Sequence, residues 1–319
     1  MTMTLYLTES NVEEILTMPA AIRAIEDALR ALSNGDAINR PRQRVRVPNG
    51  VLQVMPAGFS TRGYVGFKYY ASFKSATRFW FHLLDATSGE LVCIMQANKL
   101  GQMRTGAASG VATKYLAREN ANVVGLIGTG WQAASQLEAI CAAREIEIAR
   151  AYSRDAEHRK NFARMLSARL NVDVRGVDSA RDAVRDADIL IAATNAREPV
   201  LRGEWIKPGA HINAIGANRI DARELDDDAV NRCAFICVDS IEQAKIEARD
   251  LVEPIERGRL KWEDVKELSD VVSGKIVGRA QADAITLFKS LGIALEDVAV
   301  GAWVYERARE MKIGAEISL

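Results

Sequence analysis

The sequence is poor in the residues that build metal sites and disulfide frameworks. Its 319 residues include three histidines and four cysteines, and no two cysteines form a Cys-x-x-Cys pair. Scattered histidines disfavour a zinc site. Cysteines without such a pair are typical of buried thiols in a reducing compartment rather than of disulfides. We therefore expect neither a bound metal nor a disulfide.

Charge and hydropathy argue against nucleic acid and membrane as partners. Lys plus Arg and Asp plus Glu number 42 each, so no net basic field attracts nucleic acid or anionic lipid. No segment approaches the roughly 20 apolar residues of a membrane span. Residues 1–10 lack the basic start and apolar run of a signal peptide. With 48% hydrophobic and 26% charged residues, the chain suits about two folded domains in the cytoplasm.

The two halves of the chain differ in hydrophobic pattern. Up to residue 96, alternating segments between turn sequences predict an antiparallel or mixed sheet, preceded by two helices. From residue 122, strands and helices alternate, which predicts a parallel, doubly wound sheet. The expected strands are 44–47, 51–55, 64–71, 79–84, 91–94, 122–127, 148–152, 188–193, 211–216 and 234–238. The expected helices after residue 96 are 97–118, 131–144, 156–170, 180–186, 221–231, 241–256, 282–291 and 295–311. A terminal helix of this kind often returns to the first domain, which would make that domain discontinuous.

Residues 123–133 predict a dinucleotide-binding site. A short apolar strand runs into Gly128-x-Gly130-x-x-Ala133, and a helix-forming segment follows. Gly128 permits the tight turn, Gly130 lets the backbone approach a pyrophosphate, and Ala133 lets the helix pack against the strand. A helix that begins near Trp131 directs free N–H groups at the phosphates. We assign the pyrophosphate of NAD or NADP to Gly128, Thr129, Gly130, Trp131, Gln132 and Ala133.

The end of the second strand bears on the choice between NAD and NADP. A carboxylate there bonds the ribose 2′-hydroxyl, whereas an arginine or serine suits a 2′-phosphate. Ser153 stands where an NAD-type acid is expected, and Arg154 follows it. This slightly favours NADP. Two alternatives stay open, since Asp155 is close enough in sequence to reach the ribose and Arg154 could be a solvated residue at a helix start.

Later strand ends should also face the dinucleotide. Thr194 comes at the end of the third strand of this region, and Ile215-Gly216-Ala217-Asn218 at the end of the fourth. Because parallel strands end at one edge of a sheet, we expect these residues beside the cofactor. The alternative is ordinary turn chemistry.

Three cations stand in unusual settings. Arg44 opens an extended segment, Lys68 lies in an apolar strand, and Arg104 lies in a helix of small residues. A buried cation needs an anionic partner. Each is a candidate ligand for an anionic substrate, although surface or structural charges are the alternative.

Motifs in order along the whole chain resemble the ornithine cyclodeaminase/mu-crystallin family. They are Arg44-x-x-x-Pro48, Met55-Pro56-Ala57, Gly66-Phe67-Lys68, Asp85-x-x-x-Gly89, Arg104-Thr105-Gly106-Ala107-Ala108, Lys114-Tyr115-Leu116-Ala117, Gly128-x-Gly130-x-Gln132-Ala133, Ile212-Asn213-Ala214-Ile215-Gly216, Arg223-Glu224-Leu225-Asp226 and Phe288-Lys289-Ser290-Leu291-Gly292. The family includes cyclodeaminases, alanine dehydrogenases, ketimine and cyclic-imine reductases, and ligand-binding crystallins. The resemblance is therefore specific for the family and much less so for the reaction.

The resemblance implies an α/β chain with a Rossmann domain at 119–291. It also implies a discontinuous α+β domain, 1–118 with 292–319, that binds substrate and forms a homodimer. In related enzymes the residues matching Arg44 and Lys68 hold the carboxylate of an amino or imino acid. The residue matching Arg104 contacts the cofactor and the carboxylate. Those matching Ser290 and Leu291 close the site, so we assign Ser290 to the cofactor and Leu291 to the substrate.

One departure from the family pattern favours a reductase. Related cyclodeaminases and the archaeal alanine dehydrogenase carry an aspartate where this chain has Asn218, and an amide is no general base. Asp221 could replace the missing acid. We predict an NAD(P)-dependent oxidoreductase that reduces the C=N bond of a small imino acid, or acts as an amino acid dehydrogenase, with Lys68 as proton donor. A cyclodeaminase that retains NAD and a non-catalytic, dinucleotide-regulated binding protein are the alternatives.

Overall fold

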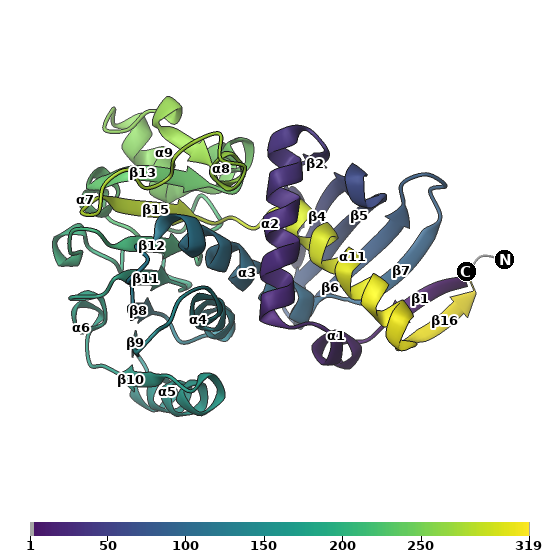
Figure 1. Ribbon diagram of the computed structural model, residues 1–319, viewed down its shortest axis with the longest axis horizontal. Helices are drawn as coiled ribbons and strands as arrows, with labels where there is room; N and C mark the ends of the chain where they lie inside the picture. Colours follow the sequence, from purple (N-terminus) through teal and green to yellow (C-terminus); the bar gives the residue numbers. More distant parts are fainter. Residues whose placement is uncertain (1–2, 319) are drawn as a thin grey trace. The chain divides into compact units, whose positions relative to one another are not determined.

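The computed structural model describes residues 3–318 (Figure 1), whose contacts form two compact units. The terminal unit comprises the residues up to Arg104 and those from Ile293 onward, and the central unit is Thr105–Gly292. The first division falls inside helix α3 (Asn98–Leu116), ahead of the 118/119 boundary expected from the sequence. The second half of α3 bonds within the central unit, where Asn213 Nδ2 donates to Thr113 Oγ1 at 3.0 Å.

The terminal unit contains an 8-stranded mixed sheet. Its order is β16-β1-β7-β6-β5-β4-β2, with β3 paired to β4. The elements are β1 (Met3–Leu7), α1 (Glu9–Ile15), α2 (Met18–Asn34), β2 (Ala37–Asn39), β3 (Gln43–Val47), β4 (Gly50–Phe59), a 3-10 turn (Ser60–Arg62), β5 (Tyr64–Phe73), β6 (Ala76–Asp85), β7 (Leu91–Gln96), α11 (Ala294–Met311) and β16 (Ala315–Ser318). All five expected strands are confirmed, whereas β1, β2 and β16 were not expected. β1 runs parallel to β7 and antiparallel to β16.

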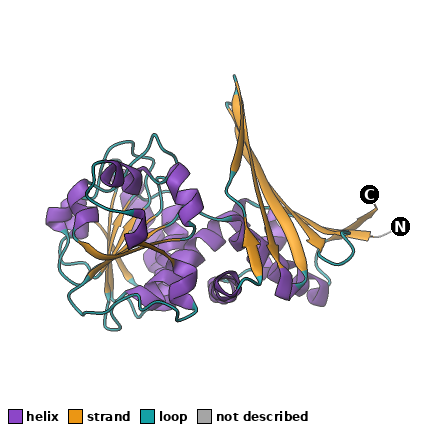
Figure 2. Cartoon of the chain, turned by 90° about the horizontal axis from the view of Figure 1, so that it is seen from above, coloured by secondary structure: helices purple, strands orange, loops and turns teal. Residues whose placement is uncertain are grey.

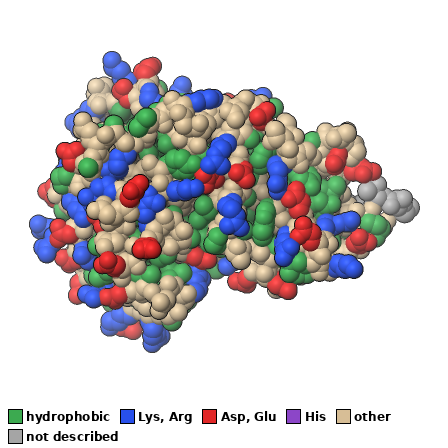
Figure 3. Space-filling view, viewed as in Figure 1, with side chains coloured by type: hydrophobic (Ala, Val, Ile, Leu, Met, Phe, Trp, Pro, Cys, Tyr) green, Lys and Arg blue, Asp and Glu red, His purple; other side chains and the backbone are tan. Residues whose placement is uncertain are grey.

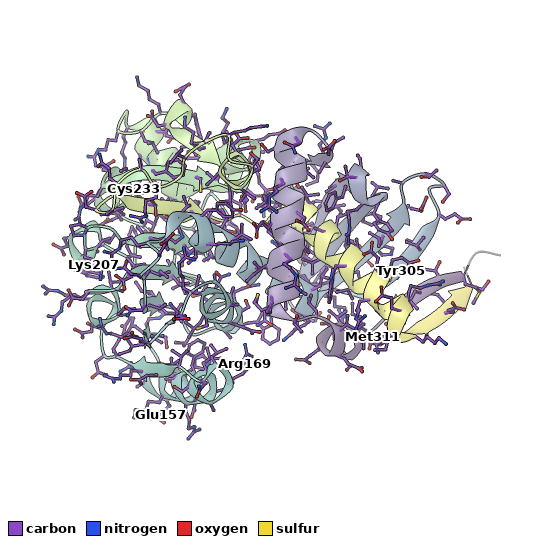
Figure 4. All side chains as sticks on the ribbon, viewed as in Figure 1. Glu157, Arg169, Lys207, Cys233, Tyr305 and Met311 are labelled. Carbon is purple, nitrogen blue, oxygen red and sulfur yellow. The ribbon has the colours of Figure 1, made fainter. Side chains whose placement is uncertain are left out.

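Helices α2 and α11 lie along one face of this sheet (Figures 1 and 2). Met55, Phe81 and Met95 point to that face and are fully buried. The first half of α11 is buried all round, whereas Tyr305 and Met311 mark its more exposed second half (Figure 4). The alternate side chains of the strands point the other way and stay exposed, although many are apolar: Val45, Val47, Leu52, Val65 and Phe73.

The central unit contains an 8-stranded sheet in which every pairing is parallel. Its order is β10-β9-β8-β11-β12-β15-β13-β14, and helices flank both faces (Figure 2). The elements are β8 (Val123–Ile127), α4 (Trp131–Ala143), β9 (Ile148–Tyr152), α5 (Ala156–Leu170), β10 (Asp173–Gly176), α6 (Ala180–Val184), β11 (Ile189–Ala192), a 3-10 turn (Gly203–Trp205), β12 (His211–Ala214), α7 (Asp227–Asn231), β13 (Cys233–Val238), α8 (Ile241–Glu247), α9 (Arg249–Glu256), a 3-10 turn (Trp262–Asp264), β14 (Val265–Glu267), α10 (Leu268–Val272) and β15 (Ile285–Lys289). The doubly wound parallel sheet is confirmed.

Three expected helices need correction. The helix expected at 282–291 is wrong, because this segment holds strand β15 between β12 and β13. All five residues of β15 are buried, and a short, fully buried run has no alternation that would separate strand from helix. The helix expected at 221–231 is reduced to α7, since the Asp250 carboxylate accepts the backbone N–H groups of Glu224 and Leu225. The helix expected at 241–256 breaks at Ala248 into α8 and α9.

The described residues show a surface of mixed charge, four free thiols and no membrane-spanning helix. No helix within residues 3–318 is both long and apolar enough to cross a membrane. Basic and acidic side chains are interspersed over the face shown in Figure 3. The four cysteines are free thiols, of which Cys93 and Cys237 are buried, and Cys233 opens β13 (Figure 4). Burial raises the pKa of Cys233 to about 12, so this thiol is a poor nucleophile.

Candidate active site

The predicted cofactor residues of the central unit gather at one edge of its sheet. Strands β9, β8, β11, β12 and β15 are successive neighbours, and parallel strands present their carboxyl ends together. The residues in question follow these five ends: Ser153 and Arg154 after β9, 128–133 after β8, Thr194 after β11, 215–218 after β12, and Ser290 and Leu291 after β15. The strand order therefore places them along a common edge.

The two glycines of the β8–α4 turn have different physical roles. Gly128 has a φ of 103°, and a Cβ there would lie 2.2 Å from the carbonyl oxygen of Ala193, so the fold itself requires glycine. Gly130 has a φ of −81° and is the N-cap of α4, and nothing lies within 4 Å of the place its Cβ would take. Ala133 is fully buried, whereas Trp131 is 54% exposed. The open space beside Gly130, at a helix N-terminus, fits the pyrophosphate of a dinucleotide.

The residues expected near the adenosine ribose form a small polar cluster. Thr129 Oγ1 donates to Ser153 Oγ at 2.8 Å and lies 2.8 Å from Nδ1 of His158, a residue that sequence analysis missed. Asp155 is the N-cap of α5, where its carboxylate accepts the His158 backbone N–H at 2.9 Å. Asp155 therefore has a structural function, and the exposed Arg154 lies beside it.

A buried carboxylate, missed as a functional residue, ties the ends of β11 and β12 together. Glu224 accepts from the Thr194 backbone N–H at 2.6 Å and from its hydroxyl at 2.8 Å. It also accepts from the N–H groups of Gly216 at 2.7 Å and Ala217 at 3.0 Å. Burial raises the pKa of Glu224, and the positive charge of Lys289 opposes the rise. Glu224 belongs to the Arg223-Glu224-Leu225-Asp226 motif, so the sequence could have marked it as a candidate. The loops whose N–H groups it binds are identified only in the folded chain.

Other predicted residues after β12 and β15 differ in their surroundings. Asp239 Oδ2 accepts the Leu291 backbone N–H at 2.7 Å and the Ser290 hydroxyl at 3.4 Å, and both donors are buried. Asn218 is half-buried. Asp221 has a side chain 58% exposed and pairs with Arg219 at 3.1 Å, so it is a solvated carboxylate rather than a buried acid.

In the terminal unit, two of the predicted cations share one carboxylate. Lys68 Nζ on β5 donates to Asp297 Oδ1 at 2.7 Å, and Arg104 Nε on α3 donates to the same oxygen at 3.0 Å. Arg104 Nη1 also donates to Glu296 Oε2 at 2.7 Å. All four side chains are buried. Sequence analysis missed both acids, although two adjacent carboxylates in the apolar segment 294–302 call for buried cationic partners.

Burial gives Lys68 an unusual acidity. It lowers the pKa of Lys68 to about 7, with help from the positive charges of Arg104 and Arg42, while Asp297 opposes the change. The Lys68 ammonium therefore gives up its proton more readily than a solvent-exposed lysine does. A group of this kind suits general acid–base chemistry.

The third predicted cation joins the same cluster through neutral groups. Arg44 Nε donates to Gln53 Oε1 at 3.2 Å, and the Tyr70 hydroxyl donates to the same oxygen at 2.6 Å. The Tyr70 ring lies 6.0 Å from Lys68 Nζ and 5.9 Å from the Arg42 guanidinium. Such distances allow cation–π attraction. Arg44, Lys68 and Arg104 thus belong to one cluster, whereas Leu291 lies in the central unit.

The fold and these residues define a dinucleotide-dependent enzyme class, and comparison with known proteins gives the family. The model of the ornithine cyclodeaminase/mu-crystallin family matches residues 2–312. The chain belongs to this family, and the predicted resemblance is confirmed.

Curated relatives agree with the predicted reaction class. The chain is 35% identical over 325 residues to alanine dehydrogenase of Archaeoglobus fulgidus, covering 98% of each chain. It is 39% identical over 236 residues to Δ1-pyrroline-2-carboxylate reductase of Bacillus cereus, covering 74% of this chain and 72% of that protein. These relatives confirm the predicted class of oxidoreductase, which acts on CH–NH or CH–NH2 bonds.

Solved structures share the fold over the whole chain. Δ1-Pyrroline-2-carboxylate reductase of Thermococcus litoralis, in complex with NADH and L-proline, has a TM-score of 0.94 and 37% identity, with 98% of this chain and 100% of that chain covered. An archaeal alanine dehydrogenase dimer with bound NAD has a TM-score of 0.94 and 34% identity, with both chains fully covered at 100%. The structural neighbours thus bind NAD or NADH.

The turn geometry predicts that Gly130→Val removes dinucleotide binding without unfolding the protein. The valine side chain would occupy the space assigned to pyrophosphate, and it would meet no atom of the protein within 4 Å of its Cβ. Calorimetric titration with NADH and NADPH should show at least about a hundredfold weaker binding, the loss of about 2.7 kcal/mol, with an unchanged urea midpoint. Gly128→Ala is the matched control and should instead lower the midpoint. Binding as tight as in the unaltered protein would contradict the assignment.

Proposed function

We propose that the chain is an NAD(P)H-dependent imino acid reductase, which converts the C=N bond of a small carboxylated imine into an amine. The observation that carries the proposal is the buried Lys68, whose pKa is lowered to about 7 within a cluster of cations on the terminal unit. The family relationship and the fit of the central unit to a dinucleotide support the same reaction class. The substrate we propose is a cyclic imino acid or an imino diacid.

Arg44 is the cation that we assign first to the substrate carboxylate. A guanidinium binds a carboxylate through two parallel hydrogen bonds, and its orientation must be fixed for this geometry. Gln53, itself held by the Tyr70 hydroxyl, supplies such a constraint at Arg44 Nε. Arg104 and Leu291 are the other predicted contacts of the substrate. The Arg104 guanidinium also donates hydrogen bonds to Glu296 and Asp297.

Lys68 is the proposed proton donor. When bound, the nicotinamide supplies the hydride that reduces the imine carbon. The imine nitrogen must then gain or already hold one proton, and the Lys68 ammonium can supply it and become a neutral amine. A pKa of about 7 matches this task, because a donor of the usual lysine pKa would release its proton far less readily at neutral pH.

Asn218 supports reduction over deamination. A cyclodeaminase needs a group that deprotonates the substrate amine or activates water, and an amide does neither. The exposed Asp221, which pairs with Arg219, lacks the buried setting of a tuned catalytic acid. An imine that is already formed needs only hydride and a proton.

The decisive experiment for this function is a screen of small imines with both cofactors. Cyclic five- and six-membered 2-carboxy imines and imino diacids should oxidise NADH or NADPH, as followed by the loss of nicotinamide absorbance. Ornithine and alanine serve as comparison substrates. Ammonia release from ornithine without net cofactor turnover would show a cyclodeaminase instead. Tight imine binding without any turnover would show a binding protein.

We propose NADP(H) as the favoured cofactor form, with Arg154 as the 2′-phosphate ligand. Ser153 offers a hydroxyl at the end of β9, and Asp155 is engaged in capping α5. Arg154→Ala should then raise the KM for NADPH about tenfold or more, the range of a charge-assisted hydrogen bond, and leave that for NADH nearly unchanged. The control is Lys160→Ala, which removes an exposed cation within α5 that pairs with Glu157. Equal losses with the two cofactors would assign Arg154 to surface charge.

We also propose a homodimer that forms through the open face of the terminal sheet. Val45, Leu52 and Val65 share this face and are 58%, 36% and 40% exposed, and apolar side chains exposed on one face of a sheet favour a symmetric interface. Light scattering at micromolar concentration should give twice the 35.0 kDa chain mass. Val65→Asp should yield monomers, whereas Val277→Asp, at a 75% exposed valine of the central unit, should not. A monomeric unaltered protein would refute the proposal.

A further inference from the structure

We propose that Asp297 is a positioning residue for proton transfer, which holds the Lys68 ammonium in place as the acid of the reaction. The inference rests on the proposed reductase function, in which Lys68 donates the proton. It assigns to α11 a role in the chemistry, beyond closing the terminal unit.

The contacts of Asp297 point to this role. Its side chain is 0% exposed, and its Oδ1 accepts from both Lys68 Nζ at 2.7 Å and Arg104 Nε at 3.0 Å. Asp297 lies in the first turns of α11, where the positive end of the helix dipole favours an ionised carboxylate. Its Oδ2 is buried and has no hydrogen-bond partner among the described residues. One fixed oxygen thus sets the place of the Lys68 ammonium.

Fold stability alone gives a weak reason for this cluster. Desolvation offsets most of the attraction within a buried ion pair, and replacing such pairs by apolar side chains of similar volume is often neutral or stabilising. Lys68, Arg104, Glu296 and Asp297 are nevertheless all buried where α11 and α3 meet the sheet. Their arrangement is better explained by a requirement for a lysine that can change its protonation state.

The balance of charge explains how Asp297 would act. Two cations, Lys68 and Arg104, face two carboxylates, Glu296 and Asp297, so these four charges cancel. The other groups facing Lys68 are the Arg42 cation and the Tyr70 ring. When Lys68 gives its proton to the substrate, the four groups carry one net negative charge. That charge attracts the next proton to the Lys68 amine.

The test is the pH profile of imine reduction, kcat/KM, in Asp297→Asn. Activity requires protonated Lys68 and so falls as pH rises through the Lys68 pKa. Removing the carboxylate removes the group that raises this pKa, and the alkaline midpoint should move down by about one unit or more. Asp297→Glu should restore the midpoint toward that of the unaltered enzyme. Glu296→Gln is the matched control, because Glu296 accepts from Arg104 Nη1 at 2.7 Å, and it should shift the midpoint much less.

A second variant, with the opposite expected shift of the alkaline midpoint, tests the inference if Asp297→Asn does not fold. Arg104→Gln removes a positive charge that lowers the Lys68 pKa, so its alkaline midpoint should move up. If Asp297→Asn, or Arg104→Gln in its place, lowers activity equally at every pH with an unmoved midpoint, the role of the cluster is structural and the inference is wrong.

Lys68→Met separates this inference from the function on which it rests. If this variant reduces imines with the alkaline limb unchanged, Lys68 is not the donor and that part of the proposed function fails. If Lys68→Met no longer reduces imines while Asp297→Asn keeps the original midpoint, Lys68 remains the proposed proton donor. Only the positioning role of Asp297 is then wrong.

Discussion

The terminal unit depends on the neutralisation of buried cations by one helix. Lys68 and Arg104 enter the interior from β5 and α3, and without Asp297 and Glu296 each would be an unpaired charge in an apolar environment. Removing one partner of such a pair is far more damaging than never having placed it there. The position of α11 along the sheet is therefore constrained by charge as well as by packing. Burial lowers the pKa of Lys68 to about 7, and the Asp297 carboxylate of α11 opposes that fall.

The central unit uses a buried carboxylate for a different purpose. The Glu224 carboxylate accepts backbone N–H groups from two loops, after β11 and β12. Those loops carry residues expected to meet the dinucleotide, so their conformation is set before a ligand arrives. Asp250 in turn accepts the backbone N–H of Glu224 at 2.8 Å and pairs with Lys289 at 3.0 Å. Preorganised loops bind a ligand without first losing their own conformational freedom.

Local patterns predicted much of the fold, and the failures have physical causes. The strand–turn–helix around Gly128 and Gly130 is a local signal, and the structure places it as expected. The residues of β15 predict a helix wrongly, because burial on both faces removes the alternation that identifies a strand. Lys68 was identifiable from its apolar strand, but its partner Asp297 is 229 residues away in sequence. A charge pattern can show that a partner is needed, and only the folded chain identifies which residue it is.

The return of α11 to the terminal sheet has a consequence during translation. The central unit is one continuous segment, 105–292, and all of it leaves the ribosome before residue 294 does. Until α11 is made, Lys68 and Arg104 have no carboxylates to meet, and burying them would be unfavourable. The sheet that emerges first must therefore be completed last, after the nascent chain has already produced the whole dinucleotide-binding segment.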